Sequence, residues 1–257
     1  MASQQGKWLW KVVAGVIVNS CVKPERPFGM RFPILYSLVF LAACDVPQPS
    51  APASEPQLSP AEAARSFGAV VQAVEPVAER ECRNRTSGVN CDFRIVVDSR
   101  KSEPPNAFQH IDEQGRPVIT FTVALIASAA TADEMAFVMS HEAAHHIRRH
   151  IERQRQNAQA SAVVFGGLAT LTGGNATDVE YARRLGAAVG ARSYSKEFEL
   201  EADELGTIIT YRAGYDPLKG AGFFTRIPDP GDRFLGTHPP NIERLMKVRA
   251  TSESLGL

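Results

Sequence analysis

The sequence predicts an α+β fold that is mostly α-helical and carries one small β-sheet. The helices are predicted from apolar residues at helical spacing behind clear start signals, and the sheet from three short β-prone segments between residues 93 and 123. A chain of 257 residues with 44% hydrophobic and 22% charged residues is long enough for one globular domain plus an appendage. Its formal net charge is zero, with 28 residues of each sign, so it lacks the basic excess of a nucleic-acid-binding protein.

The first predicted helix begins at Ser59. This serine can act as N-cap, with Pro60 at the first helical position and Glu62 at the capping-box position. We expect the helix to run toward Arg83, with Pro76 as a kink or a break.

The β-prone segments follow this helix. They comprise residues 93–98, 106–111 and 117–123, and the "DEQG" stretch at 112–115 can turn between the last two. The sequence therefore predicts a small sheet that contains a hairpin.

Most of the second half of the chain is predicted to be helical. One helix starts at the capping-box pair Thr131 and Glu134, and a long one spans Ser195 to Arg212. Asp216 opens a short helix, and a last helix starts near Pro240. Between the two long helices, the apolar, glycine-rich residues 160–176 are predicted to form a buried connection, with a mobile hairpin or a membrane-touching flap as alternatives.

The N-terminal part predicts export. An apolar run at 32–43 suits the core of a signal segment, and its ending at Cys44 resembles a bacterial lipoprotein signal, in which the cysteine is lipidated. We interpret residues 30–43 as signal peptide and 44–58, rich in Pro, Ser and Ala, as a flexible tether. Residues 1–29 are interpreted as an upstream extension from a misassigned start codon, with a two-pass anchor as the alternative.

Two further cysteines lie in the predicted folded part. Export would place Cys82 and Cys91 in an oxidising compartment, and a polar loop separates them. We expect a disulfide between them, with two free thiols as the alternative.

The stretch "HEAAH" is the strongest chemical signal. On a helix, His141 and His145 lie one turn apart on one face, so both imidazoles can bind one Zn²⁺. Glu142 is turned aside by about 100° and can act as general base.

A third ligand is available on the helix predicted from Ser195. Glu199 can complete a His₂Glu site, and Asp203, four residues later, can accept a hydrogen bond from a ligating histidine. Glu197 and Glu201 are competing candidates, and a solvated acidic face is the alternative for this segment taken alone.

Three ordered motifs carry a family resemblance. They are His141-Glu142-x-x-His145, then Ser195-Lys196-x-x-Glu199-x-Glu201-Ala202-Asp203, then Thr237-His238-Pro239 with Arg244. Together they resemble the HtpX and CAAX-prenyl-protease family of gluzincin zinc metalloendopeptidases, particularly its small periplasmic lipoprotein members. The resemblance implies a zincin-like domain at 59–250, followed by a tail at 251–257. It also implies endopeptidase activity on misfolded or membrane-associated proteins.

The resemblance also assigns roles to single residues. It implies His141, His145 and Glu199 as ligands of one Zn²⁺ per chain, Glu142 as base and Asp203 as a hydrogen-bond partner of a ligand. It further suggests that His238 is a fourth zinc ligand that closes the site or an oxyanion stabiliser, with a structural helix cap as the alternative.

The remaining predictions concern substrate and surroundings. An edge strand with Asn106, Ala107 and Phe108 could pair with an extended substrate. His146 and His150 are expected on a basic, solvated surface, and His110 on the strand surface.

Two classes of function compete. The first is a zinc endopeptidase held in the periplasm by a lipid on Cys44, on the inner or the outer membrane. The second is a zinc-fold binding protein or holdase without turnover, against which the intact Glu142 argues, because binding alone needs no base.

Overall fold

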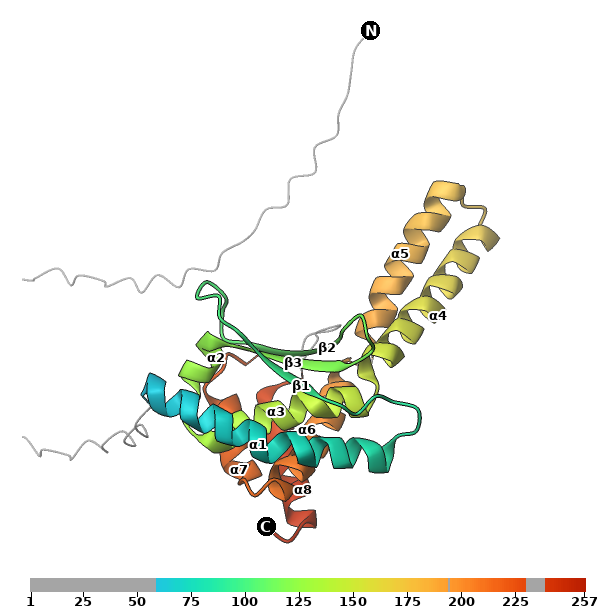
Figure 1. Ribbon diagram of the computed structural model, residues 1–257. Coiled ribbons are helices and arrows are strands. Elements are labelled where there is room, and N and C mark those ends of the chain that lie inside the picture. The colour runs from blue at the N-terminus through green and yellow to red at the C-terminus, as the bar shows by residue number, and fades with distance from the viewer. Residues whose placement is uncertain (1–58, 194, 230–238) are drawn as a thin grey trace, which may run out of the picture. The chain divides into compact units, whose positions relative to one another are not determined.

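The computed structural model describes residues 59–193, 195–229 and 239–257. The predictions on residues 1–58, including Cys44, and on His238 lie outside these described residues. The order of elements is α1 (Pro60–Arg85), β1 (Arg94–Asp98), β2 (Ala107–Ile111), β3 (Pro117–Thr122), α2 (Val123–Ser128), α3 (Ala132–Ile147), α4 (His150–Leu171), α5 (Ala176–Arg192), α6 (Ser195–Arg212), α7 (Pro217–Gly220), the 3₁₀-helix η1 (Ala221–Thr225) and α8 (Asn241–Ser254). This mostly helical arrangement with one small sheet (Figure 1) confirms the predicted α+β class.

The sheet has the strand order β1-β3-β2. Its central strand β3 is buried along its whole length and pairs in parallel with β1 and antiparallel with β2. The β2–β3 pair is the predicted hairpin, and β2 lies at an edge of the sheet. Within the described part of the chain, β2 pairs with β3 on one side only, so its other side can pair with another extended chain.

Helices α1, α3 and α6 pack together beneath this sheet (Figure 1). Val70 and Val74 of α1, Met139 of α3, and Leu205 and Ile209 of α6 belong to one apolar cluster of fully buried side chains. This core fixes α3 against α6, the two helices on which the candidate metal ligands lie.

Helix α1 continues through Pro76, so the alternative of a break there is wrong. A proline inside a helix removes one backbone hydrogen bond, which destabilises an isolated helix by about 3 kcal/mol. Val74 and Val77, on either side of Pro76, are both buried in the core. Their burial offsets the loss and holds the helix together.

Residues 160–176 do not form the predicted buried connection. They extend α4 to Leu171 and lead into α5, and the two helices lie side by side (Figure 1). The glycines permit close helix contact: a Cβ at Gly190 would lie 2.3 Å from the Asn157 carbonyl oxygen, and one at Gly186 would lie 2.5 Å from that of Ser161. Within the stretch itself, a Cβ at Gly166 would lie 2.6 Å from Cγ of Arg183 on α5, so this glycine lies at the contact between the two helices.

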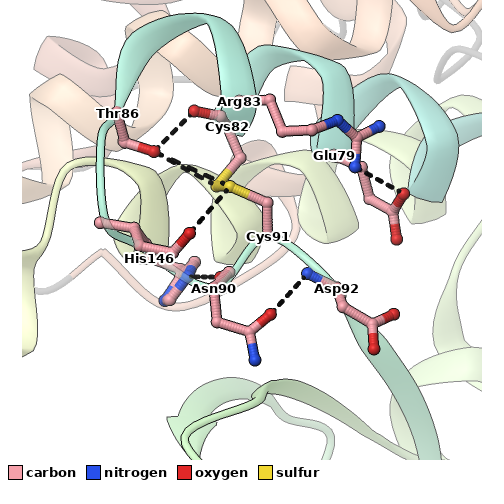
Figure 2. The surroundings of a disulfide bond; sticks show 9 residues. Glu79, Cys82, Arg83, Thr86, Asn90, Cys91, Asp92 and His146 are labelled. Atoms are coloured by element: carbon pink, nitrogen blue, oxygen red, sulfur yellow. Dashed lines mark hydrogen bonds and ion pairs between the residues drawn. A yellow bond between two sulfur atoms is a disulfide. The ribbon is translucent and has the colours of Figure 1, made fainter.

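Cys82 and Cys91 form the expected disulfide, with their Cα atoms 5.7 Å apart (Figure 2). The bond joins the end of α1 to the segment before β1. His146 of α3 lies beside it, with Nε2 2.7 Å from the carbonyl oxygen of Asn90. The prediction of a solvated His146 is wrong, because this side chain is buried and also packs edge-on against Phe93.

We expect replacement of both cysteines by serine to lower the free energy of unfolding by about 2–3 kcal/mol, because the cross-link closes a short loop in the unfolded chain. Urea denaturation of the double variant, compared with the oxidised and the reduced wild type, measures this. Equal stability of oxidised wild type and double variant would show that the bond does not contribute.

Candidate metal centre

Close packing of α3 on α6 brings the two predicted motifs together. A Cβ added to Gly206 of α6 would lie 3.1 Å from the backbone nitrogen and Cα of His141 on α3, so only glycine fits easily there. About two turns and one turn before Gly206, the buried carboxylates of Glu199 and Asp203 on the same helix face the histidines of α3.

His141, His145 and Glu199 form a compact cluster of three donor groups. Their ligand atoms all lie within 4.8 Å of one another. The two Nε2 atoms are 3.0 Å apart, and Glu199 approaches His141 Nε2 at 3.5 Å and His145 Nε2 at 3.4 Å. Two imidazole nitrogens and one carboxylate are a donor set typical of zinc, so these residues fit a single metal ion.

Asp203 and Arg244 contact this cluster on the side of His141 Nδ1. Asp203 is fully buried, and its Oδ1 lies 2.9 Å from His141 Nδ1. Arg244 of α8 donates two hydrogen bonds to the Asp203 carboxylate, from Nε at 2.8 Å and from Nη2 at 2.7 Å. The guanidinium also lies 3.6 Å from Glu199 and 3.9 Å from the centre of the Phe224 ring.

This environment moves the pKa values of the two clustered histidines in opposite directions. Burial disfavours the charged imidazolium of His141, but its hydrogen bonds to Asp203 and Glu199 outweigh burial and raise its pKa. Burial, together with the nearby His141, lowers the pKa of His145. Two imidazoles this close cannot both carry a proton easily, and a metal ligand needs an unprotonated nitrogen.

Glu142 lies next to the cluster, in the wall of a cavity of about 440 Å³. Burial raises the pKa of its carboxyl group to about 7, with Glu199 adding in the same direction and His141, Arg244 and a backbone hydrogen bond from Gln109 opposing. A carboxyl group with a pKa near neutrality can both accept and return a proton, as a general base must.

The edge strand β2 forms one side of the same cavity. Asn106, Ala107, Phe108 and Gln109 all line it, so the three predicted substrate-strand residues do lie beside the cluster. The cavity also has an apolar lining, formed by the aromatic and aliphatic residues Leu125, Phe137, Val138, Phe223, Phe224 and Ile227.

The competing acidic candidates lie elsewhere. Glu197 is exposed, and Glu201 pairs with His150 and Arg153. His150 was predicted on a solvated surface and is instead 4% exposed, with Nδ1 2.9 Å from Nδ1 of His145. That prediction failed because the first residue of α4 lies between His145 and Phe198, a contact that depends on how α4 meets α3 and α6 and not on a local pattern. His110 is exposed on β2, as expected.

The sequence did not reveal what Arg244 or His150 contacts. Arg244 is 41 positions from Asp203 along the chain, and their pairing follows from how α8 packs on α6. The contact of His150 could have been suspected from its spacing. It lies only five residues after His145, so a turn of the chain after the helix can bring the two side chains together.

The donor cluster and the neighbouring Glu142, whose pKa is raised, together suit a hydrolytic reaction. A half-buried carboxyl beside a three-donor metal cluster, in an open cavity next to a strand edge, can activate water against an extended peptide. Fold and site together have the arrangement of a gluzincin-type metallopeptidase domain.

Comparison with known proteins also points to a peptidase family. The model of peptidase family M48 matches residues 67–252, more than half of the chain, and the chain belongs to this family. It is 27% identical over 167 residues to a putative beta-barrel assembly-enhancing protease of Vibrio cholerae, covering 60% of this chain and 34% of that protein. The beta-barrel assembly-enhancing protease of Escherichia coli K12 is 29% identical over 139 residues, which is 49% of this chain and 28% of the relative.

A eukaryotic relative gives a similar match. The mitochondrial metalloendopeptidase OMA1 of Saccharomyces cerevisiae is 27% identical over 171 residues, covering 62% of this chain and 46% of the relative. The chain therefore spans less than half the length of these relatives.

Proposed function

We propose that this protein is a zinc-dependent endopeptidase that degrades misfolded or membrane-associated proteins in the bacterial periplasm. The observation that carries the proposal is the cluster of His141, His145 and Glu199 with the half-buried Glu142 beside it. Degradation in envelope quality control is supported by the names of two relatives, which describe proteases that enhance assembly of β-barrel proteins.

Zinc is the metal that best suits these residues. His141 and His145 offer neutral nitrogen donors and Glu199 offers one charged oxygen, which together leave a coordination position for substrate or water. When bound, zinc supplies a Lewis acid that polarises a peptide carbonyl and makes water easier to deprotonate. Asp203 holds His141 in the orientation and tautomer that this ligand needs.

Glu142 would carry the proton during hydrolysis. It takes a proton from the attacking water and passes it to the nitrogen of the leaving amine. Its position in the cavity wall is suited to both transfers, because the cavity also contains the histidine cluster.

Strand β2 would hold the substrate. The backbone oxygen of Asn106 accepts a hydrogen bond from Thr122, and Asp112 donates one to Arg116, so both face the β3 side. By the alternation of a strand, Ala107 and Gln109 direct their backbone groups to the other edge, where the N–H of Gln109 donates to the carboxyl group of Glu142. An extended peptide could pair there with little regard for its sequence, which suits an enzyme that cuts unfolded chains.

Cleavage of unfolded casein by the purified chain tests this proposal. We expect hydrolysis that stops on treatment with a zinc chelator and returns when zinc is added back. Suppression of casein aggregation without any cleavage would favour the alternative, a zinc-fold holdase.

Attachment to a membrane is the second part of the proposal. We propose that Cys44 carries the lipid. The helical hairpin supports a membrane location, since residues 156–177 contain no charged side chain and Val163, Leu168 and Leu171 are 70%, 56% and 84% exposed. Among the described residues, no helix is both long and apolar enough to span a bilayer.

We expect Cys44→Ser to move most of the protein from the membrane to the soluble fraction. The serine cannot carry the proposed lipid, and without those acyl chains stable attachment is lost. Fractionation of cells expressing the variant measures this, with Cys21→Ser as the control for loss of a cysteine outside the proposed lipidation site and the disulfide. Unchanged fractionation would point to residues 8–18 as the anchor.

A further inference from the structure

His150 makes a contact that the proposed chemistry does not yet use. It is the first residue of α4, is buried, and lies with Nδ1 2.9 Å from Nδ1 of His145. Its ring is stacked on Phe198 of α6, with centroids 4.6 Å apart and an angle of 7° between the planes. The imidazole is thus held in one orientation between α3 and α6.

The backbone before His150 is shaped to place it there. Arg149 has φ +58° and ψ +37°, a left-handed conformation that is unusual for a residue other than glycine. Such a conformation costs about 1 kcal/mol or more and persists where the surrounding structure requires it. Here it turns the chain between α3 and α4, so that the first side chain of α4 lies over His145.

The hydrogen bonds assign a tautomer to each ring. Nε2 of His145 faces His141 and Glu199, and a nitrogen that binds metal carries no proton. The proton of His145 must therefore be on Nδ1, which donates to Nδ1 of His150. His150 is then protonated on Nε2, which lies 3.2 Å from Oε2 of Glu201.

Glu201 is itself held by an arginine. Arg153 donates to both of its carboxylate oxygens, at 2.6 Å and 3.1 Å, and its guanidinium lies 4.3 Å from the centre of the Phe198 ring. The series from His145 to His150, Glu201 and Arg153 thus has a donor facing an acceptor at every step.

The other clustered histidine has the same kind of support. His141 donates from Nδ1 to Asp203, and Arg244 binds that carboxylate with two hydrogen bonds. Each histidine is therefore backed by a carboxylate and an arginine, directly for His141 and through a second imidazole for His145.

We propose that His150, held by Glu201 and Arg153, is the positioning residue that fixes the tautomer and orientation of His145 as a metal ligand. This inference rests on the proposed metal site and adds three residues to it. It also explains why Glu201, which the sequence offered as a competing ligand, is directed away from the cluster.

The test compares variants of the full chain by their zinc affinity, measured in competition with a chromophoric chelator. His150→Phe keeps the ring that stacks on Phe198 but removes the acceptor for His145, and we expect zinc binding to weaken about 10–100-fold. His150→Asn restores an acceptor near the position of Nδ1 and should recover most of the affinity. Glu201→Gln, which leaves an uncharged acceptor for His150, should weaken binding by less than His150→Phe.

His146→Phe is the matched control. His146 is also a buried histidine of this region, but it bonds to Asn90 and not to the cluster. Its replacement should leave zinc affinity within about twofold of wild type, well below the effect of losing a ligand's partner.

Two further readouts separate positioning from folding. The absorption spectrum of the Co²⁺-substituted protein should change in His150→Phe, and the melting temperature of the metal-free protein should fall no more than in His146→Phe. Wild-type zinc affinity and spectrum in His150→Phe would overturn the inference, as would a loss of affinity that His150→Asn does not restore. Failure of the proposed metal site would instead show as absent zinc binding in the wild type.

Discussion

Glu142→Gln is expected to reduce casein hydrolysis by about 10²–10⁴-fold while zinc content and fold stay as in wild type. The substitution removes the group that accepts a proton from water, and it leaves His141, His145 and Glu199 intact. It also keeps the size of the side chain, so the cavity that Glu142 lines with β2 should change little. The loss should therefore appear in turnover, with little change in metal binding.

The measurement follows release of casein fragments at equal zinc occupancy, with zinc determined by elemental analysis. Glu113→Gln, at the turn between β2 and β3, is the matched control, because it makes the same chemical change outside the cavity. Full activity in Glu142→Gln would show that another residue is the base, whereas loss of both activity and zinc would show that the carboxylate supports the metal site.

Local signals predicted most of the helices and strands. Ser59 and Glu62 do form a capping box, and Thr131 accepts a hydrogen bond from the backbone of Glu134. These caps depend on residues within one turn, so they are readable without knowledge of the rest of the chain. The same holds for α6, which spans the predicted Ser195–Arg212.

Features that depend on contacts between distant segments were not predicted. The capping box of Asn175 and Asp178, which starts α5, was visible in the sequence, yet the glycines around it suggested a connection. Gly166, one of the glycines of that stretch, lies at the contact with α5, and glycine alone does not indicate whether it provides a turn or a close approach.

In the candidate site, too, the contacts set by local spacing were predicted, and those between distant segments were not. Helical spacing of four residues placed His141 with His145 and Glu199 with Asp203, because that spacing returns a side chain to the same face. No spacing rule relates Arg244 to Asp203, which lie on different helices.

Glu199→Ala is expected to remove most of the zinc from the purified protein. The cluster has three donors from two helices, and loss of the carboxylate leaves only two imidazoles on one helix. Zinc sites in proteins are held by three or four ligands, so the remaining pair should bind the metal weakly. The buried Arg244, which lies 3.6 Å from Glu199, would also lose a compensating negative charge, and its positive charge would then repel the metal.

Glu201→Ala is the control that makes this prediction specific. Glu201 is on the same helix two positions later, but its carboxylate binds Arg153 and His150 and does not belong to the cluster. Elemental analysis after purification in excess zinc should therefore find about one zinc per chain in Glu201→Ala, even if its affinity is reduced, and little zinc in Glu199→Ala. Full zinc in Glu199→Ala would exclude it as a ligand. Zinc lost from Glu201→Ala and kept in Glu199→Ala would instead move the third ligand to Glu201, which requires α6 to rotate so that Glu201 faces α3.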